Sequence, residues 1–475
     1  MEEEFLDFDD NQEMESIEEI AKQYADLKNG ISGNILSEMA FELLIDYYDE
    51  QQNLNKALEV ALTSREYYPF SAELMVKHAD LLIADRKYNL SLDILEQARL
   101  LNSDDINIYI LKVDALLALN EIDQAFEVFH TSLNMFEEDE KLDLLFEYVD
   151  VFDDYEVFDM VFDCLKMILD IAPNDEVALY KICYWVEFTG RFEESIRIHQ
   201  KIIDSNPYNE LAWFNLAAAF QGLKLYEKAI DAYQYAITIN EKFDIAYRNL
   251  GDVYIRLRKF KEAIEALTTV VELTRPEDVL YEAIGHCHHK LQNFPLARLN
   301  YRKASHMQPD DNKLHYKIAL TYMDELKWPN AIKSLEASLQ IASAPEAHLA
   351  LGECLLHQSA FNEAIYHFGI AVKQKPRNIP NWEALIKGLY AAGFFEEAEK
   401  QAQFALEATG QRPIFHFYIA MTLFAQAKNK EGLLQLELGM HHAPRLFRKV
   451  LELNPGIMQN SRVVDILARY NKSRH

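Results

Sequence analysis

Small side chains recur about every 34 residues along most of this 475-residue chain, and this period restricts the fold more than any other feature. One column, in which all residues except Val161 are small, consists of Ala57, Ser91, Ala125, Val161, Ser195, Ala229, Ala263, Ala297, Ala331, Ala364, Ala398 and Gly432. A second column lies twelve residues earlier and includes Ala79, Ala217, Gly251, Gly285, Ala319, Gly352 and Ala420. Small residues are expected where helices cross too closely for longer side chains. The two columns therefore predict two packed helices in each period.

Composition agrees with a helical repeat. Gly and Pro number only 14 and 13, and the apolar residues amount to 49%. Several prolines keep the same phase: Pro173 and Pro207 are 34 residues apart, and Pro309 follows Pro207 by three such periods. Proline cannot continue a helix, so these positions mark the ends of repeats. The chain is predicted to be all-α.

The residues within one period resemble the tetratricopeptide repeat family. Its pattern is matched by Trp213, Leu216, Ala217 and Phe220, followed by Ala229 and Tyr233. It recurs in Tyr247, Leu250, Gly251 and Tyr254 with Ala263, and in Tyr281, Ile284 and Gly285 with Ala297, Tyr301 and Pro309. The resemblance covers roughly residues 38–446. It implies an α-solenoid, a right-handed superhelix in which stacked hairpins bury each other's apolar faces.

Twelve repeats are predicted, starting near Glu38, Ala72, Ile106, Leu142, Glu176, Glu210, Asp244, Asp278, Asn312, Pro345, Ile379 and Pro413. Residues 1–37 are expected to form an acidic start, disordered over residues 1–14, and a capping helix. Residues 38–175 form divergent, acidic repeats one to four. Residues 176–446 form regular repeats five to twelve, and residues 447–475 form a C-terminal capping helix.

The net charge of −30 is concentrated at one end. Residues 1–175 contain 43 Asp and Glu against 11 Lys and Arg, whereas the remaining residues are almost balanced. Such an acidic surface repels phosphate backbones, so nucleic-acid binding is not expected. It suits a basic partner, although the charge could equally serve only to keep a large helical surface soluble.

Catalytic and metal-binding patterns are not found. No GxGxxG, Walker-type loop or GxSxG occurs. The adjacent residues His286, Cys287, His288 and His289 lack the spacing of three or four that places metal ligands on one helix face, so they are interpreted as structural. We expect no enzyme activity, cofactor or metal. The four widely spaced cysteines, the lack of a signal peptide and the lack of a long apolar run indicate a cytoplasmic protein without membrane spans.

The resemblance also implies a binding groove lined by the first helix of each repeat, through positions two, five, six and nine. In repeats one to four these positions supply an acidic trough of Glu42, Asp46, Glu73, Asp80, Asp114, Asp143, Glu147 and Asp150. The candidate peptide-binding residues that follow are aromatic, amide and basic: Tyr180, Tyr184, Phe214, Asn215, Arg248, Asn249, Arg256, Lys313 and Lys317. Asn215 and Asn249 resemble the start of a ladder that pairs with a peptide backbone.

These features predict a non-catalytic scaffold or adaptor that binds a peptide segment or partner domain in the groove. One alternative is a recognition subunit for an enzyme on a separate chain. Another is a co-chaperone that clamps an acidic C-terminal tail, for which Lys313 and Lys317 match but Arg248, Asp252 and Ala283 depart from the family's clamp. The partner's identity and the oligomeric state stay open.

Overall fold

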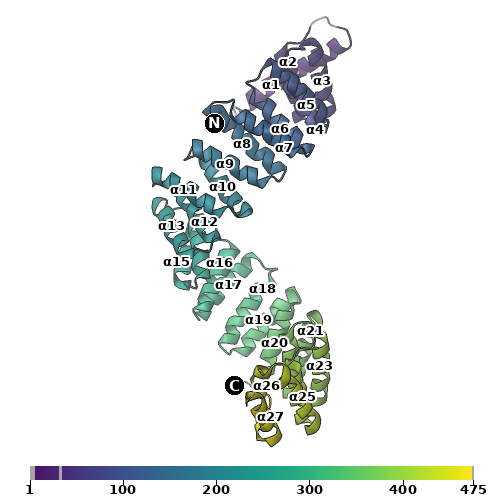
Figure 1. The fold of residues 1–475 in the computed structure, drawn as a ribbon, viewed down its shortest axis with the longest axis vertical. Coiled ribbons are helices and arrows are strands. Elements are labelled where there is room, and N and C mark those ends of the chain that lie inside the picture. Colours follow the sequence, from purple (N-terminus) through teal and green to yellow (C-terminus); the bar gives the residue numbers. More distant parts are fainter. Residues whose placement is uncertain (1–5, 32–34, 473–475) are drawn as a thin grey trace. The chain divides into compact units, whose positions relative to one another are not determined.

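The computed structural model describes residues 6–31 and 35–472, with side chains for residues 17–31 and 35–470. Over these ranges the chain is built from helices joined by short turns, without strands (Figure 1). It divides into two compact units, residues 1–241 and 242–475. The predicted boundary near residue 175, where the charge and the regularity of the repeats change, lies inside the first unit. It stays a prediction that rests on the amino-acid composition.

The first unit holds six repeats. Its helices are α1 (Leu6–Lys28), α2 (Glu38–Glu50), α3 (Leu54–Tyr67), α4 (Ala72–Ala84), α5 (Tyr88–Leu101), α6 (Ile106–Ala118), α7 (Ile122–Leu133), α8 (Glu138–Asp154), α9 (Phe158–Ile171), α10 (Glu176–Thr189), α11 (Phe192–Ser205), α12 (Glu210–Gly222) and α13 (Tyr226–Ile239). Helix α1 packs on α2 through Tyr24, as expected for a cap.

The second unit holds repeats seven to twelve and a C-terminal segment. Its helices are α14 (Asp244–Arg256), α15 (Phe260–Leu273), α16 (Asp278–Lys290), α17 (Phe294–Met307), α18 (Asn312–Asp324), α19 (Trp328–Ile341), α20 (Pro345–His357), α21 (Phe361–Gln374), α22 (Ile379–Ala391), α23 (Phe395–Ala408), α24 (Ile414–Ala425), α25 (Asn429–His442), α26 (Phe447–Leu451) and α27 (Ser461–Lys472), with 3-10 turns at Pro444–Leu446 and Pro455–Gln459. The predicted C-terminal helix is thus two helices, because Pro455 interrupts it.

Ten of the twelve first helices begin at the predicted residue. Helix α8 begins at Glu138 instead of Leu142, because its acidic first turn of Glu138, Asp139 and Glu140 stabilises the helix N-terminus. Helix α24 begins one residue later than predicted. At the start of the chain, residues 6–14 are helical, contrary to the expected disorder, since a scarcity of apolar residues does not remove their helix propensity. Residues 1–5 lie outside the described part.

One residue in the left-handed conformation closes each hairpin. These residues are Gln52, Arg86, Asn120, Glu156, Gly190, Lys224, Arg258, Gln292, Leu326, Ser359, Gly393 and Ala427. At the sixth repeat Lys224 N–H donates to the Gln221 carbonyl at 2.9 Å and Leu225 N–H donates to the Phe220 carbonyl at 2.8 Å. This is the Schellman pattern, which satisfies the last carbonyls of the first helix. The turn geometry is therefore as periodic as the packing.

We expect Gly393→Ala to destabilise the second unit by about 1 kcal/mol, because the residue has a φ of +82° and alanine is strained there. A Cβ at this glycine would meet no atom within 4 Å, so backbone strain is the whole effect. Gly369→Ala is the matched control, since it is helical with equally open surroundings and should stabilise by up to about 1 kcal/mol. Urea denaturation followed by circular dichroism measures both. Equal signs for the two substitutions would contradict the prediction.

Candidate functional site

The first helices of the repeats form the more closely spaced layer. In the first unit α2 contacts α4, α4 contacts α6, α6 contacts α8, and α10 contacts α12. Among the described helices no two second helices of successive repeats come as close. A layer with the closer spacing lies on the inner side of a curved stack, so the first helices present the inner surface of the first unit. The predicted groove residues of that unit lie on these helices.

Helix α10 presents a stripe of large apolar side chains to solvent. Val177, Tyr180, Tyr184 and Phe188 are 54%, 57%, 57% and 58% exposed. Their spacing of three or four residues places them on one face of the helix. Tyr184 and Phe188 contact each other with ring centroids 5.2 Å apart. We call these four residues the α10 stripe; contiguous exposed apolar surface of this kind is typical of interaction sites.

The α10 stripe is held from behind by buried aromatics. Trp185, which borders the stripe on α10, is 7% exposed and stacks on Phe158 of α9 at 5.1 Å. Phe188 meets the same Phe158 edge to face at 5.3 Å. Because Phe188 and Tyr184 contact these rings, the stripe is ordered without a partner, which lowers the entropy cost of binding.

Acidic side chains flank the α10 stripe on the neighbouring helix α8. Asp143, Glu147 and Asp150 are exposed there. Lys181 of α10 pairs with Asp150 of α8 at 2.7 Å, which links the two helices at their exposed surface. Lys77 and Asp46 form the equivalent pair at the same repeat positions, at 2.6 Å. Within the described part of the chain, Asp143 and Glu147 form no such ion pair.

Further along the predicted trough, the carboxyl groups perturb one another. The pKa of Asp80 is raised, mainly because the surrounding protein partly excludes water from its carboxyl group. Repulsion by the nearby Asp49 and Asp114 is the smaller cause. The pKa of Asp114 is raised by burial, although it accepts a hydrogen bond from Tyr155 Oη at 2.6 Å. Burial and the neighbouring carboxylates thus disfavour the ionised form of Asp80 and Asp114, and a cation from a partner would favour it.

Two predicted groove residues are buried and cannot contact a partner. Phe214 is 8% exposed and packs against Tyr233 with ring centroids 5.7 Å apart. Asn215 is 3% exposed; its amide donates to the Leu179 carbonyl at 2.7 Å and contacts His199 Nε2 at 3.2 Å. The prediction that Asn215 begins a peptide-binding ladder is therefore wrong, since helix α10 covers this position.

The basic residues predicted in the second unit are partly neutralised by acids of the same unit. Arg248 donates two hydrogen bonds of 3.0 Å to the carboxylate of Glu277. Lys317 forms an ion pair with Glu282. Arg256 and Lys313 are exposed, and Asn249 is half-buried. The structure thus leaves only part of the predicted basic surface available.

Val177 and Phe188 were not among the predicted groove residues. Both lie on the same helical face as Tyr180 and Tyr184, three or four residues away, so the spacing alone could have identified them.

The adjacent residues His286, Cys287, His288 and His289 include side chains that contact the protein itself. Burial raises the pKa of Cys287 to about 11, and His289 is hydrogen-bonded to Asp324 at 2.6 Å.

Among the residues whose side chains the structure describes, no three His, Cys, Asp or Glu side chains are placed to hold a metal ion together. None of the described helices combines the length and the apolar character needed to cross a membrane.

Comparison with known proteins gives family matches over part of the chain. A model of the tetratricopeptide repeat protein 21 C-terminal ARM domain matches residues 187–347, and a tetratricopeptide repeat model matches residues 316–379. The search of curated proteins finds no match.

Similar solved structures include YrrB, described as a TPR protein with an unusual peptide-binding site. It is 18% identical to this chain, the match covers 39% of this chain and 96% of YrrB, and the TM-score is 0.35. The C-terminal part of a TPR repeat-containing protein from Cytophaga hutchinsonii has 16% identity, coverage of 54% and 99%, and a TM-score of 0.44. The APC/C hetero-tetramer Cut9-Hcn1 has 14% identity, coverage of 81% and 89%, and a TM-score of 0.35. These likenesses are too weak to transfer a partner.

Proteins of the matched repeat family are generally non-catalytic scaffolds for protein interactions. The matched residues carry the same hairpin, the same left-handed turn and the same small-residue columns as the repeats on either side. The chain thus carries tetratricopeptide-type repeats over the matched residues, and its stacked helical hairpins form an α-solenoid.

Proposed function

We propose that this protein is a non-catalytic scaffold or adaptor that holds a partner segment or partner domain against the first helices of its repeats. The α10 stripe is the observation that carries the proposal. Four large apolar side chains more than half exposed on one helix face are costly for an isolated soluble protein and favourable for one that covers them with a partner. Tyrosines are also frequent among the residues that dominate interface energies.

The surroundings of the α10 stripe favour a partner segment that combines apolar and basic side chains. Apolar groups would cover Val177 and Phe188, whereas Lys or Arg would meet the exposed acids Asp143 and Glu147 on α8. Cations also bind favourably over tyrosine rings. The acidic balance of residues 1–175 would draw such a segment toward this surface.

Clamping of an acidic C-terminal tail is a less suitable function. Of the two lysines that match the clamp, Lys317 is paired with Glu282, and Arg248, which departs from the clamp pattern, is paired with Glu277. A tail would have to displace these carboxylates before it gained any interaction. A recognition role for a separate enzyme chain uses the same surface as a scaffold and differs only in which partner is captured.

The test compares capture of partners from native lysate on immobilised protein and on its variants. Tyr180→Ala with Tyr184→Ala should weaken the retained partner by about 30-fold or more, since two exposed aromatic anchors are lost. Tyr366→Ala is the matched control, because Tyr366 is a helical tyrosine with 66% exposure on the second helix of another repeat. Retention that survives the double substitution, or that is lost equally with Tyr366→Ala, would rule out the α10 stripe.

A companion variant tests the second unit. Replacing Arg248, Lys313 and Lys317 by glutamate should leave retention nearly unchanged if the partner binds the α10 stripe. Loss of the partner in this variant alone would move the site to the basic residues of the second unit and favour an acidic ligand.

A further inference from the structure

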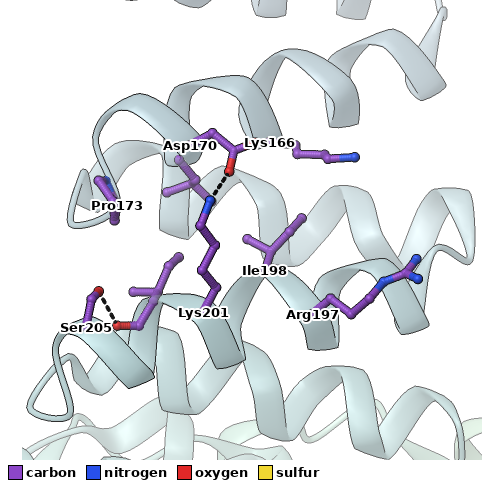
Figure 2. A pocket seen from close by; sticks show the side chains of 9 residues that line it. Lys166, Asp170, Pro173, Arg197, Ile198, Lys201 and Ser205 are labelled. Atoms are coloured by element: carbon purple, nitrogen blue, oxygen red, sulfur yellow. Dashed lines mark hydrogen bonds and ion pairs between the residues drawn. The ribbon is translucent and has the colours of Figure 1, made fainter.

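A small pocket opens between the second helices α9 and α11 (Figure 2). Its volume of about 290 Å³ is near the lower end of ligand pockets, large enough for one or two side chains. The wall is apolar: Leu169 and Ile202 are buried, each 2% exposed, and Ile198 and Pro173 are half-buried beside them. The pocket is therefore a place where a single aliphatic side chain can leave water.

Basic side chains surround this apolar wall. Lys201 reaches from α11 across the pocket to Asp170 of α9, with an Nζ to Oδ1 distance of 2.7 Å (Figure 2). Lys166 of α9 pairs with Glu194 at 3.0 Å. Arg197 extends from α11 on the same side of the pocket as Lys166, is exposed, and has no hydrogen bond or ion pair within the described part of the chain (Figure 2).

The charge of the pocket is opposite to that of its surroundings. Three cations and one acid line it, although it borders a stretch of the chain with 43 acidic and 11 basic residues. Lys166 and Lys201 compensate acids of the protein itself, whereas none of the described acids pairs with Arg197. An exposed guanidinium at the edge of an apolar pocket is suited to a carboxylate, which it can bind through two parallel hydrogen bonds.

We propose that this pocket docks a partner segment that presents one aliphatic side chain next to one or two carboxylates. The aliphatic side chain enters between Leu169, Ile198 and Ile202. One carboxylate pairs with Arg197, and a second competes with Asp170 for Lys201, whose side chain is 73% exposed and free to turn. This site lies on the second helices and selects acidic segments, so it is distinct from the α10 stripe on the first helices.

The probe is a synthetic peptide, acetylated and amidated at its ends, with the sequence Gly-Ser-Leu-Asp-Glu-Ser-Gly. It is titrated into the full chain carrying ¹³C-labelled isoleucine methyl groups. We expect saturable shifts of the Ile198 and Ile202 methyl signals, because both side chains line the pocket. A version with Ser in place of Leu, and one with two Lys in place of Asp and Glu, should each bind at least about tenfold more weakly.

The protein variant is Arg197→Glu with Lys201→Glu, for which affinity should fall by about tenfold or more. Lys22→Glu is the control, since this exposed lysine of α1 does not line the pocket and its substitution should change affinity by less than about twofold. Unchanged signals from the other isoleucines show that the variants are folded. No shift at millimolar peptide, equal binding of the Lys-containing peptide, or unchanged affinity of the double variant would overturn the proposal. Shifts that depend on protein concentration without peptide would also overturn it, by assigning the pocket to contacts between copies of the chain.

Discussion

Phe368→Ala is expected to destabilise the second unit by about 3–5 kcal/mol. Phe368 of α21 is 1% exposed, and its ring lies between two glycines on successive first helices. A Cβ added to Gly352 of α20 would be 2.4 Å from the ring, and one added to Gly388 of α22 would be 3.1 Å from it. Neither glycine has a side chain that could fill the space left by the ring, so the cavity stays large and the cost lies at the upper end of the range.

The close approach at Gly352 supplies a test of this packing. Gly352→Ala should destabilise the wild type by about 1–3 kcal/mol, because its methyl group overlaps the ring of Phe368. In the Phe368→Ala background the same substitution should be neutral or stabilising, since the methyl group enters the cavity and alanine favours the helix. Equal effects of Gly352→Ala in the two backgrounds would show that the ring and the glycine are not coupled.

The measurement needs a probe confined to the second unit, because a repeat array can unfold in parts. Trp328 and Trp382 are the tryptophans of that unit, and Trp185 and Trp213 belong to the first. Urea denaturation followed by tryptophan fluorescence, in a background with Trp185→Phe and Trp213→Phe, reports the second unit alone.

The first unit should lose about 2–3 kcal/mol of stability between pH 7 and pH 4.5 through His199. This histidine is fully buried, and burial lowers its pKa from 6.5 to about 4. Its Nδ1–H donates to the Ser195 carbonyl at 2.7 Å, and its Nε2 accepts from the Asn215 amide at 3.2 Å. The ring is held neutral, because a proton on Nε2 would face the amide hydrogens of Asn215.

The lowered pKa of His199 makes the folded state less stable at acid pH than at neutral pH. The unfolded chain binds a proton at His199 below pH 6.5, whereas the folded chain resists protonation down to about pH 4. The contribution is therefore fully present above pH 6.5 and is lost as the pH falls toward 4. His78 behaves similarly, with a pKa lowered to about 4 by burial and by Arg65, so it adds to the acid sensitivity of this unit.

A His199→Asn variant separates the two histidines. It is less stable at pH 7, but its loss between pH 7 and pH 4.5 should be smaller than that of the wild type by about 2–3 kcal/mol. Fluorescence of Trp185 and Trp213, with Trp328 and Trp382 replaced by phenylalanine, follows the first unit. Parallel stability curves for variant and wild type would exclude His199 as the source.

The sequence by itself determined the repeat, its phase and the ends of most helices. Each hairpin contacts mainly its neighbours in the chain, so the packing positions return with the period and can be recognised from residue type. All twelve residues of the first small column are buried, as predicted. The boundary errors at α8 and at the N-terminus arise where local helix propensity, which the period does not contain, extends a helix.

The tertiary structure decided which inner-surface residues are available to a partner. Tyr180 and Phe214 occupy the same position of successive repeats, yet Tyr180 is 57% exposed and Phe214 is 8% exposed. Helix α12 is covered by α10, whereas α10 and α8 do not come as close. The spacing of neighbouring helices also opens the pocket between α9 and α11. These spacings depend on many side chains from several helices at once, so no single repeat of the sequence specifies them.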